Sequence, residues 1–184
     1  MTGVDHRAMN ALALVQSFVN ITQAETVPDF AAAIRGRVQA LARAHRMLGE
    51  ASWSGADLAS LLAAEVPDNL PPRVRSDGPP VLLPTAAVQP LALVLHELLS
   101  NAARHGALAA QTGSVEIAWT VRAQSLHIEW KENGASGVIQ PTAPGVGLRM
   151  LESVVKQQLG GRVSMTWERD GVHAEMSLPM ETAL

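Results

Sequence analysis

The sequence predicts an α+β protein in which a hairpin of two helices precedes a sheet with helices on one face. Over residues 5–48, apolar side chains recur with the period of an amphipathic helix, and after Gly106 the period falls to two, as in half-buried strands. Of the 184 residues, 47% are hydrophobic, which is enough material for a substantial core. Together these observations favour helices packed on one face of an antiparallel or mixed sheet.

The composition excludes several kinds of function. The formal net charge is −3 and no polybasic run occurs, so neither nucleic acid nor an anionic membrane surface is an expected partner. The chain has no cysteine, which excludes disulfides and thiolate metal sites. No apolar run reaches the roughly 18 residues of a spanning helix, and no secretory signal is evident. We therefore expect a soluble cytoplasmic chain that does not insert into membranes.

The first two elements are expected to form a helical hairpin. Residues 5–24 contain no Gly or Pro and are apolar around much of the helix. A second helix starts with Thr26 as its cap, Pro28 in its first turn and Asp29 completing a capping box, and runs to about Leu48. Because two antiparallel helices make only half a bundle, dimerisation into four helices would bury both apolar faces. The side of the second helix expected to face solvent carries Arg35, Arg37, Arg43 and Arg46.

A proline-rich stretch separates this hairpin from the rest of the chain. The boundary is placed near Trp53 to Gly55, which divides the chain into a hairpin domain, residues 1–54, and a second domain, residues 55–184. The short elements expected after it are a helix over 56–65 and strands over 73–74 and 81–83. Further elements are expected as a helix over 85–105, strands over 114–121 and 125–132, a helix over 148–159, and a final hairpin of strands over 162–167 and 172–178.

Two patterns in the second domain suit the binding of a phosphorylated ligand. Glu97 and Asn101 lie one turn apart on one helix face, and their oxygens are ligands of the kind that Mg²⁺ prefers. Gly145 and Gly147 precede a helix whose free N–H groups would favour a phosphate. Taken alone, the first pattern also fits an exposed helix face, and the second fits an ordinary turn into a helix.

Two further residues have a chemical and a structural interpretation. Glu132 ends a strand, where a carboxylate could accept a hydrogen bond from an exocyclic amine, but it also fits a charged strand end. His6 follows Asp5 near a helix start, and a carboxylate next to an imidazole can raise its basicity as a nucleophile. A histidine of no functional consequence is the alternative. The other histidines considered show no metal-ligand spacing among themselves: His45, His105, His127 and His173.

Several segments, taken in order, resemble the motifs of HWE-type sensor histidine kinases. They correspond to the phospho-acceptor box, the second dimerisation helix, the N box with its His before Glu, the Trp-x-Glu motif and the second Gly box. These segments are Asp5-His6-Arg7-Ala8-Met9-Asn10, Arg37-Val38-Gln39-Ala40-Leu41-Ala42-Arg43-Ala44-His45, His96-Glu97-Leu98-Leu99-Ser100-Asn101-Ala102-Ala103-Arg104-His105-Gly106-Ala107-Leu108, Trp130-Lys131-Glu132 and Gly145-Val146-Gly147-Leu148-Arg149. The resemblance covers nearly the whole chain.

The resemblance implies a fold and a reaction. The hairpin would dimerise into a four-helix bundle, and the second domain would be a GHKL (Bergerat-type) α/β sandwich that binds ATP with Mg²⁺. The γ-phosphoryl group would pass to His6 and then to an Asp of a response regulator receiver domain. A sensor domain would lie upstream in a longer parent chain or act in trans.

The resemblance also assigns residues. Asn101 would hold Mg²⁺, Glu97 would assist the metal or a water, and Glu132 would contact the adenine amine. Asp5 and Glu97 would join His6 in catalysis. The nucleotide-binding set implied in this way is His96, Asn101, Arg104, His105, Glu132, Gly134, Gly145, Gly147 and Leu148.

The chain departs from the family pattern at Met9, where Lys is usual, at Val146, where an aromatic is usual, and in the glycine-poor segment after Glu132. These changes leave open an alternative in which the chain is a histidine phosphotransfer relay with degenerate or absent ATP binding. A protein-serine kinase of the same fold is a third hypothesis, and a hairpin that carries a histidine argues against it.

Overall fold

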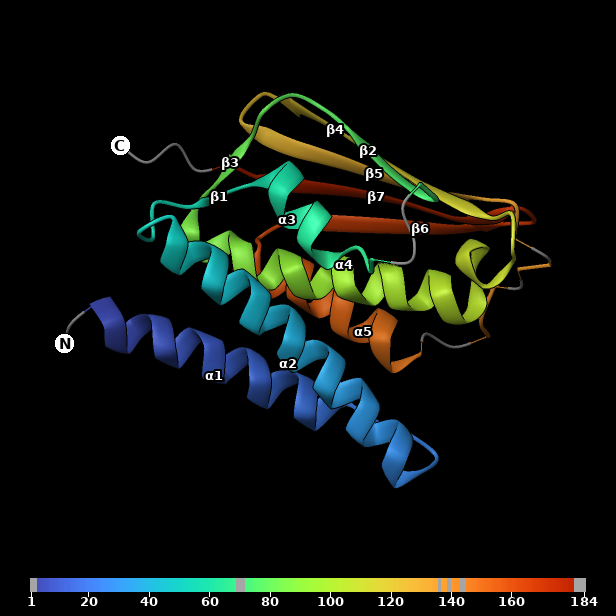
Figure 1. Ribbon diagram of the computed structural model, residues 1–184, viewed down its shortest axis with the longest axis horizontal. Helices are drawn as coiled ribbons and strands as arrows, with labels where there is room; N and C mark the ends of the chain where they lie inside the picture. The colour runs from blue at the N-terminus through green and yellow to red at the C-terminus, as the bar shows by residue number, and fades with distance from the viewer. Residues whose placement is uncertain (1–2, 69–71, 136, 139, 143–144, 181–184) are drawn as a thin grey trace.

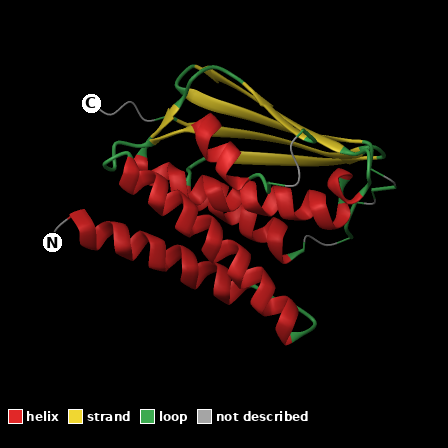
Figure 2. Ribbon diagram, in the orientation of Figure 1, coloured by secondary structure: helices red, strands yellow, loops and turns green. Residues whose placement is uncertain are grey.

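The computed structural model describes residues 3–68, 72–135, 137–138, 140–142 and 145–180. A curved sheet forms the outer layer, a layer of helices covers one of its faces, and the N-terminal hairpin lies against those helices (Figures 1 and 2). The predicted α+β class is confirmed.

The hairpin consists of α1 (Gly3–Ile21) and α2 (Val27–Glu50). Thr26 caps α2, because its side chain accepts a hydrogen bond from the backbone N–H of Asp29 at 3.2 Å. The predicted start of this helix is thus confirmed, and its end lies two residues beyond the expected Leu48. One face of α2 is buried in the common hydrophobic core through Ala40, Leu41, Ala44 and Leu48.

Three short elements follow the hairpin. Strand β1 (Ala56–Asp57) pairs antiparallel with β3 (Leu82–Leu83), and α3 (Leu58–Glu65) starts directly after β1. Asp57 caps α3 by accepting a hydrogen bond from the N–H of Ser60 at 2.9 Å. The helix expected from residue 56 therefore starts two residues later, because the sheet pairing takes the first two residues.

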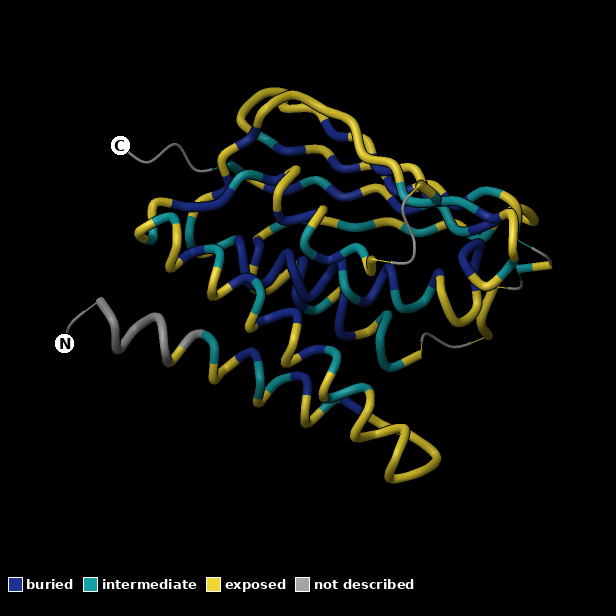
Figure 3. Tube along the Cα trace, viewed as in Figure 1, coloured by how far each residue is buried: buried dark blue, intermediate teal, exposed yellow. Residues whose placement is uncertain are grey.

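The main sheet has five strands in the order β2-β4-β5-β7-β6. Its members are β2 (Val74–Asp77), β4 (Ser114–Arg122), β5 (Ser125–Asn133), β6 (Arg162–Glu168) and β7 (Gly171–Pro179). The β2–β4 pair is parallel and the other neighbours are antiparallel. Burial alternates along β4 and β5, so one face of the sheet is covered and the other is exposed (Figure 3).

The central helix α4 (Thr85–His105) has the bounds that the sequence predicts. It is buried along most of its length, and Pro90 lies inside it. A 3₁₀ turn, η1 (Ala107–Ala109), follows directly. Helix α5 (Val146–Ser153) starts two residues before its predicted start and continues as a π-helical turn, η2 (Val154–Gln158). The C-terminal part of α4 and the start of α5 thereby border the same space.

Candidate active site

A cavity of about 1010 Å³ lies among α4, α5, the sheet and the turn of the N-terminal hairpin. It collects residues that are far apart in the sequence. Eight of the residues singled out by sequence line it: Glu97, Asn101, Arg104 and His105 of α4, Glu132 of β5, and Gly145, Gly147 and Leu148 at the start of α5.

Glu97 and Asn101 form one wall of this cavity. Glu97 is buried, and its two carboxylate oxygens accept hydrogen bonds from Arg37, with Nε 2.7 Å from Oε1 and a terminal guanidinium nitrogen 3.1 Å from Oε2. Asn101, one turn later, is half-buried. The backbone of Gly147 passes so close that a Cβ there would lie 2.6 Å from Oε2 of Glu97. A glycine is therefore required at this position to bring the start of α5 against the carboxylate.

Glu132 is held on another wall by two donors. Its Oε2 accepts a hydrogen bond from the backbone N–H of Ala107 at 2.9 Å, and its Oε1 accepts one from the indole N–H of Trp130 at 3.3 Å. Trp130 reaches it because residues two apart on a strand share a face. Burial raises the pKa of Glu132 above its ordinary value, and these hydrogen bonds oppose that rise. The result is a fixed carboxylate acceptor that borders the cavity.

Gly106 lies in the segment that resembles the N box, but the sequence reasoning assigned it no role in the site. A Cβ at this position would lie 2.1 Å from Oε2 of Glu132. Only the absence of a side chain lets the end of α4 approach the carboxylate. No pattern within the strand or the helix alone reveals this contact.

Two residues of the predicted nucleotide-binding set lie elsewhere. His96 is not among the residues that line the cavity; it packs against α2, where a Cβ on Gly36 would lie 2.9 Å from its Nε2. Burial lowers the pKa of His96, so the imidazole is neutral at this helix contact. Gly134 adopts a φ of +80° in the turn after β5, and its N–H donates to Oδ1 of Asp170 at 3.1 Å.

The predicted phospho-acceptor segment lies in the first turns of α1. Residues 5 and 6 are helical, as expected. The side chains of Asp5 and His6 lie outside the part of the chain that the structure describes, so their assigned roles stay predictions.

The interpretation of the α2 arginines as a solvent face is wrong for two of them. Arg37 is only 5% exposed and pairs with Glu97. Arg43 is half-buried and pairs with the buried Glu65 of α3, with a nitrogen–oxygen distance of 2.5 Å. Both side chains turn toward the second domain, because α2 packs on it and the acidic partners there are buried.

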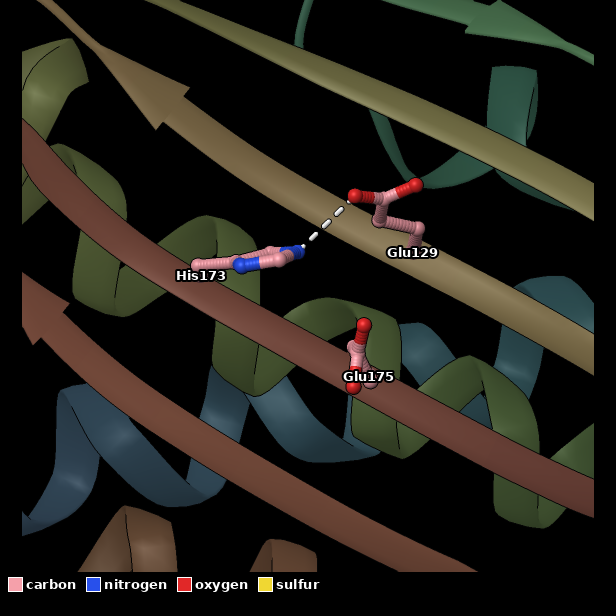
Figure 4. Close-up of side chains that lie close together, drawn as sticks. All are labelled: Glu129, His173 and Glu175. Atoms are coloured by element: carbon pink, nitrogen blue, oxygen red, sulfur yellow. Dashed lines mark hydrogen bonds and ion pairs between the residues drawn. The ribbon is translucent and has the colours of Figure 1, made fainter.

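A separate group of polar side chains lies on the exposed face of the sheet. His173 and Glu175 of β7 lie near Glu129 of β5, and Nε2 of His173 is 2.9 Å from Oε1 of Glu129 (Figure 4). Glu129 and Glu175 are exposed, and the sheet separates the group from the cavity. Cross-strand pairing brings these residues together, so their sequence spacing carries no signal.

Comparison with known proteins agrees with the sequence motifs. Residues 3–80 match the model of the HWE histidine kinase family. A blue-light-activated histidine kinase of Rhizobium johnstonii is 40% identical over 178 residues, which is 96% of this chain. The chain is thus similar to the HWE histidine kinase family in its first 80 residues and to a histidine kinase over nearly all of its length. His96, Trp130 and Glu132 are the residues that the sequence motifs assign to the family's signature, and Trp130 and Glu132 form the donor–acceptor pair described above.

Other relatives and solved structures of histidine kinases extend this likeness. A blue-light-activated histidine kinase of Brucella anthropi is 32% identical over 96% of the chain. The chain spans 52% of the Rhizobium relative and 38% of the Brucella relative. The blue-light activated histidine kinase EL346 of Erythrobacter litoralis has the same fold, with a TM-score of 0.77 at 17% identity over all of this chain and 62% of that one. Its separate histidine kinase domain aligns over 95% of this chain and 94% of its own, with a TM-score of 0.64 at 16% identity. The fold is thus that of a histidine kinase with a GHKL-type catalytic domain.

Within the described residues, no helix is both long and apolar enough to cross a bilayer.

Proposed function

We propose that this chain is the kinase core of a two-component sensor protein. It transfers the γ-phosphoryl group of ATP to His6 and from there to an Asp of a response regulator receiver domain. The observation that carries this proposal is the convergence of Glu97, Asn101 and Glu132 on one cavity, beside the glycines that start α5. The relay alternative is not favoured, because a phosphotransfer relay has no need for this constellation.

The two ends of the nucleotide are assigned to different walls of the cavity. The carboxylate of Glu132 accepts a hydrogen bond from the adenine amine, since it is fixed by Trp130 and Ala107 at the wall. At the other end, Gly145 and Gly147 leave backbone N–H groups at the start of α5 for the phosphates. Arg104 and His105, both exposed at the cavity, lie at the C-terminal end of α4. A carboxylate acceptor for the base at one end and N–H donors for the phosphates at the other suit a nucleoside triphosphate.

The residues present also fit Mg²⁺. Asn101 and Glu97 offer a carboxamide oxygen and a carboxylate at the cavity wall, and Mg²⁺ takes few protein ligands alongside phosphates. When bound, the ion would neutralise charge on the phosphates. The chain's own contribution is to orient the nucleotide and exclude water around it.

We propose that the helical hairpin, residues 1–54, is the dimerisation element and that residues 55–184 are the catalytic domain. Several large apolar side chains of α1 and α2 are exposed in the single chain. They are Met9 and Leu12, each 61% exposed, Val19 at 40%, Val27 at 81%, Phe30 at 36% and Val38 at 42%. A homodimer through the hairpin would cover them in a four-helix bundle.

The test of this function is incubation of the purified chain with Mg²⁺ and γ-labelled ATP. Acid-labile, alkali-stable label should accumulate on the wild type and on the His127→Ala control, whose histidine is exposed on the sheet. It should be absent from His6→Ala and strongly reduced in Asn101→Ala. Label that persists in His6→Ala would place the acceptor elsewhere. Nucleotide binding without any label on the wild type would contradict autokinase activity of this chain.

A further inference from the structure

Arg37 connects the hairpin to the cavity through a buried chain of hydrogen bonds. Its Nε and one terminal nitrogen donate to the two oxygens of Glu97. Its other terminal nitrogen donates to the hydroxyl of Thr22, which itself donates to the carbonyl of Phe18. One guanidinium thereby joins the end of α1, the middle of α2 and the wall of the cavity. Both side chains of the Arg37–Glu97 pair are only 6% exposed.

The position of this pair matters because of where the hairpin meets the cavity. Residues 22–25, which follow α1, line the cavity. His6 lies fifteen residues before Ile21, the last residue of α1, and a rise of about 1.5 Å per residue separates them by about 22 Å. In Figure 1 the first turns of α1 lie at the opposite end of the hairpin from the turn into α2. Transfer needs reacting atoms about 3–3.5 Å apart, so this arrangement keeps the nucleotide from the acceptor of its own chain.

The same pair also occupies the carboxylate that Mg²⁺ would use. Each oxygen of Glu97 already accepts one hydrogen bond from Arg37, and the backbone of Gly147 lies close to Oε2. A magnesium ion bound to this carboxylate would weaken the guanidinium contacts, because two cations that share one buried carboxylate repel each other. Two events that compete for one group are coupled, and the coupling acts equally in both directions.

We propose that Arg37 and Glu97 form an autoinhibitory latch: the ion pair holds the catalytic domain on the hairpin away from His6, and a magnesium nucleotide opens it by competing with Arg37 for Glu97. This inference rests on the proposed function, since it takes the cavity as the nucleotide site and His6 as the acceptor. Arg37 also lines the cavity, and in this scheme it is a positioning residue because it acts through Glu97; a direct contact with the nucleotide would instead make Arg37→Gln bind more weakly.

A second ion pair between the hairpin and the helices that cover the sheet offers a matched control. Arg43 of α2 pairs with Glu65 of α3, outside the cavity. Arg43→Gln removes an arginine from the same helix and weakens the same domain contact, but it leaves Glu97 untouched. A difference in affinity for the magnesium nucleotide between Arg37→Gln and Arg43→Gln therefore reports on competition at Glu97 rather than on loosened packing.

The decisive measurement is the affinity of the whole chain for a non-hydrolysable ATP analogue, by calorimetry, with and without Mg²⁺. In Arg37→Gln we expect affinity to rise about tenfold in Mg²⁺, within the usual range of coupling between sites, and to stay unchanged in EDTA. Arg43→Gln should match the wild type in both. Equal or weaker binding of the magnesium nucleotide by Arg37→Gln would overturn the latch.

A second measurement needs no variant, so it stands even if Arg37→Gln does not fold. Hydrogen exchange of the wild-type chain is followed with saturating analogue and Mg²⁺, and with analogue in EDTA. Amides of residues 34–41 should exchange faster only in Mg²⁺, as α2 leaves α4. Unchanged exchange alongside measured binding would overturn the latch and leave the proposed function standing. A wild type that binds no nucleotide would overturn both.

Discussion

At the scale of single residues, Glu132 illustrates how neighbouring groups fix one carboxylate at the wall of a cavity. Its two oxygens are satisfied by Trp130 and Ala107, and Gly106 leaves space for it. An acceptor whose rotamer is locked in this way loses little entropy when a ligand binds. The Trp-x-Glu motif therefore has a direct physical meaning: the tryptophan orients the glutamate.

Glu132→Gln tests the role of this charge through its pH dependence. Because burial raises the pKa of Glu132, the carboxylate takes up its proton at a higher pH than an ordinary glutamate. Nucleotide affinity of the wild type should fall as pH is lowered through that raised pKa. At neutral pH, Glu132→Gln should bind about 10- to 100-fold more weakly, since a hydrogen bond to a charged group contributes about 1.5–3 kcal/mol.

Titration calorimetry of an ATP analogue between pH 5 and 8 checks this expectation. Glu129→Gln serves as the control, because Glu129 is exposed on the other face of the sheet. Its affinity should follow the wild-type profile. A Glu132→Gln variant that keeps the wild-type pH dependence would show that another group titrates.

Gly106→Ala tests the close approach of α4 to the same carboxylate. The added Cβ would meet Oε2 of Glu132 at 2.1 Å, so the glutamate or the helix end must move. We expect a stability loss of about 1–3 kcal/mol from overpacking, together with weaker nucleotide binding. Urea unfolding and calorimetry measure the two effects.

Gly49→Ala is the matched control, because nothing lies within 4 Å of a Cβ there and α2 continues through this residue. It should be neutral or stabilising by up to about 1 kcal/mol. Equal stability of Gly106→Ala and Gly49→Ala would contradict the close packing at Glu132.

At the scale of elements, the β4–β5 hairpin shows a mismatch between sequence and backbone. Its two-residue turn, between the paired Arg122 and Ser125, consists of Ala123 and Gln124 with φ of 47° and 59°. Such a turn favours Asn-Gly, because both positions require positive φ. The strands close nonetheless, because their inward side chains are buried along the sheet. Tertiary packing therefore overrides local turn preference here.

The double variant Ala123→Asn and Gln124→Gly should relieve this mismatch. We expect a gain of about 1 kcal/mol in the free energy of unfolding, seen as a rise of about 2–4 °C in Tm for a domain of this size. The substitutions keep the contact between this turn and the residue after β7, because it is a backbone hydrogen bond: the N–H of Met180 donates to the carbonyl of residue 124 at 2.8 Å. Differential scanning calorimetry measures the change, and a lower Tm would refute the interpretation of strain.

At the scale of the whole molecule, the hairpin presents two faces with different partners. One face of α2 packs on α3 and α4 and is fastened by Arg37–Glu97 and Arg43–Glu65. The exposed apolar side chains of α1 and α2 lie outside that contact. The hairpin could therefore carry a signal between the proposed dimer interface and the proposed nucleotide site, because both use the same two helices.

Leu12→Glu tests the proposed dimer. A buried charge without a partner is costly, so the variant should be a monomer at a protein concentration where the wild type is a dimer. Light scattering after size-exclusion chromatography measures the mass. Leu82→Glu is the control, because Leu82 is 64% exposed in β3 and outside the hairpin. Dimers formed equally by both variants would contradict an interface at Leu12.

The sequence by itself determined the order of the elements, the α+β class and the motifs of the family. These follow from local rules: hydrophobic period sets helix or strand, capping residues set helix starts, and Glu97 and Asn101 share a helix face by spacing alone. The bounds of α4 and the N-cap of α2 were predictable for that reason.

Only the tertiary structure decided how distant elements meet. It made β2 parallel to β4, placed His96 at a helix contact rather than in the cavity, and turned Arg37 from a presumed solvent face onto Glu97. A charged side chain on an amphipathic helix reads as exposed unless its buried partner is known, and here that partner lies sixty residues away. Which buried charges pair over a long sequence distance depends on how the elements pack, so local sequence patterns do not predict it.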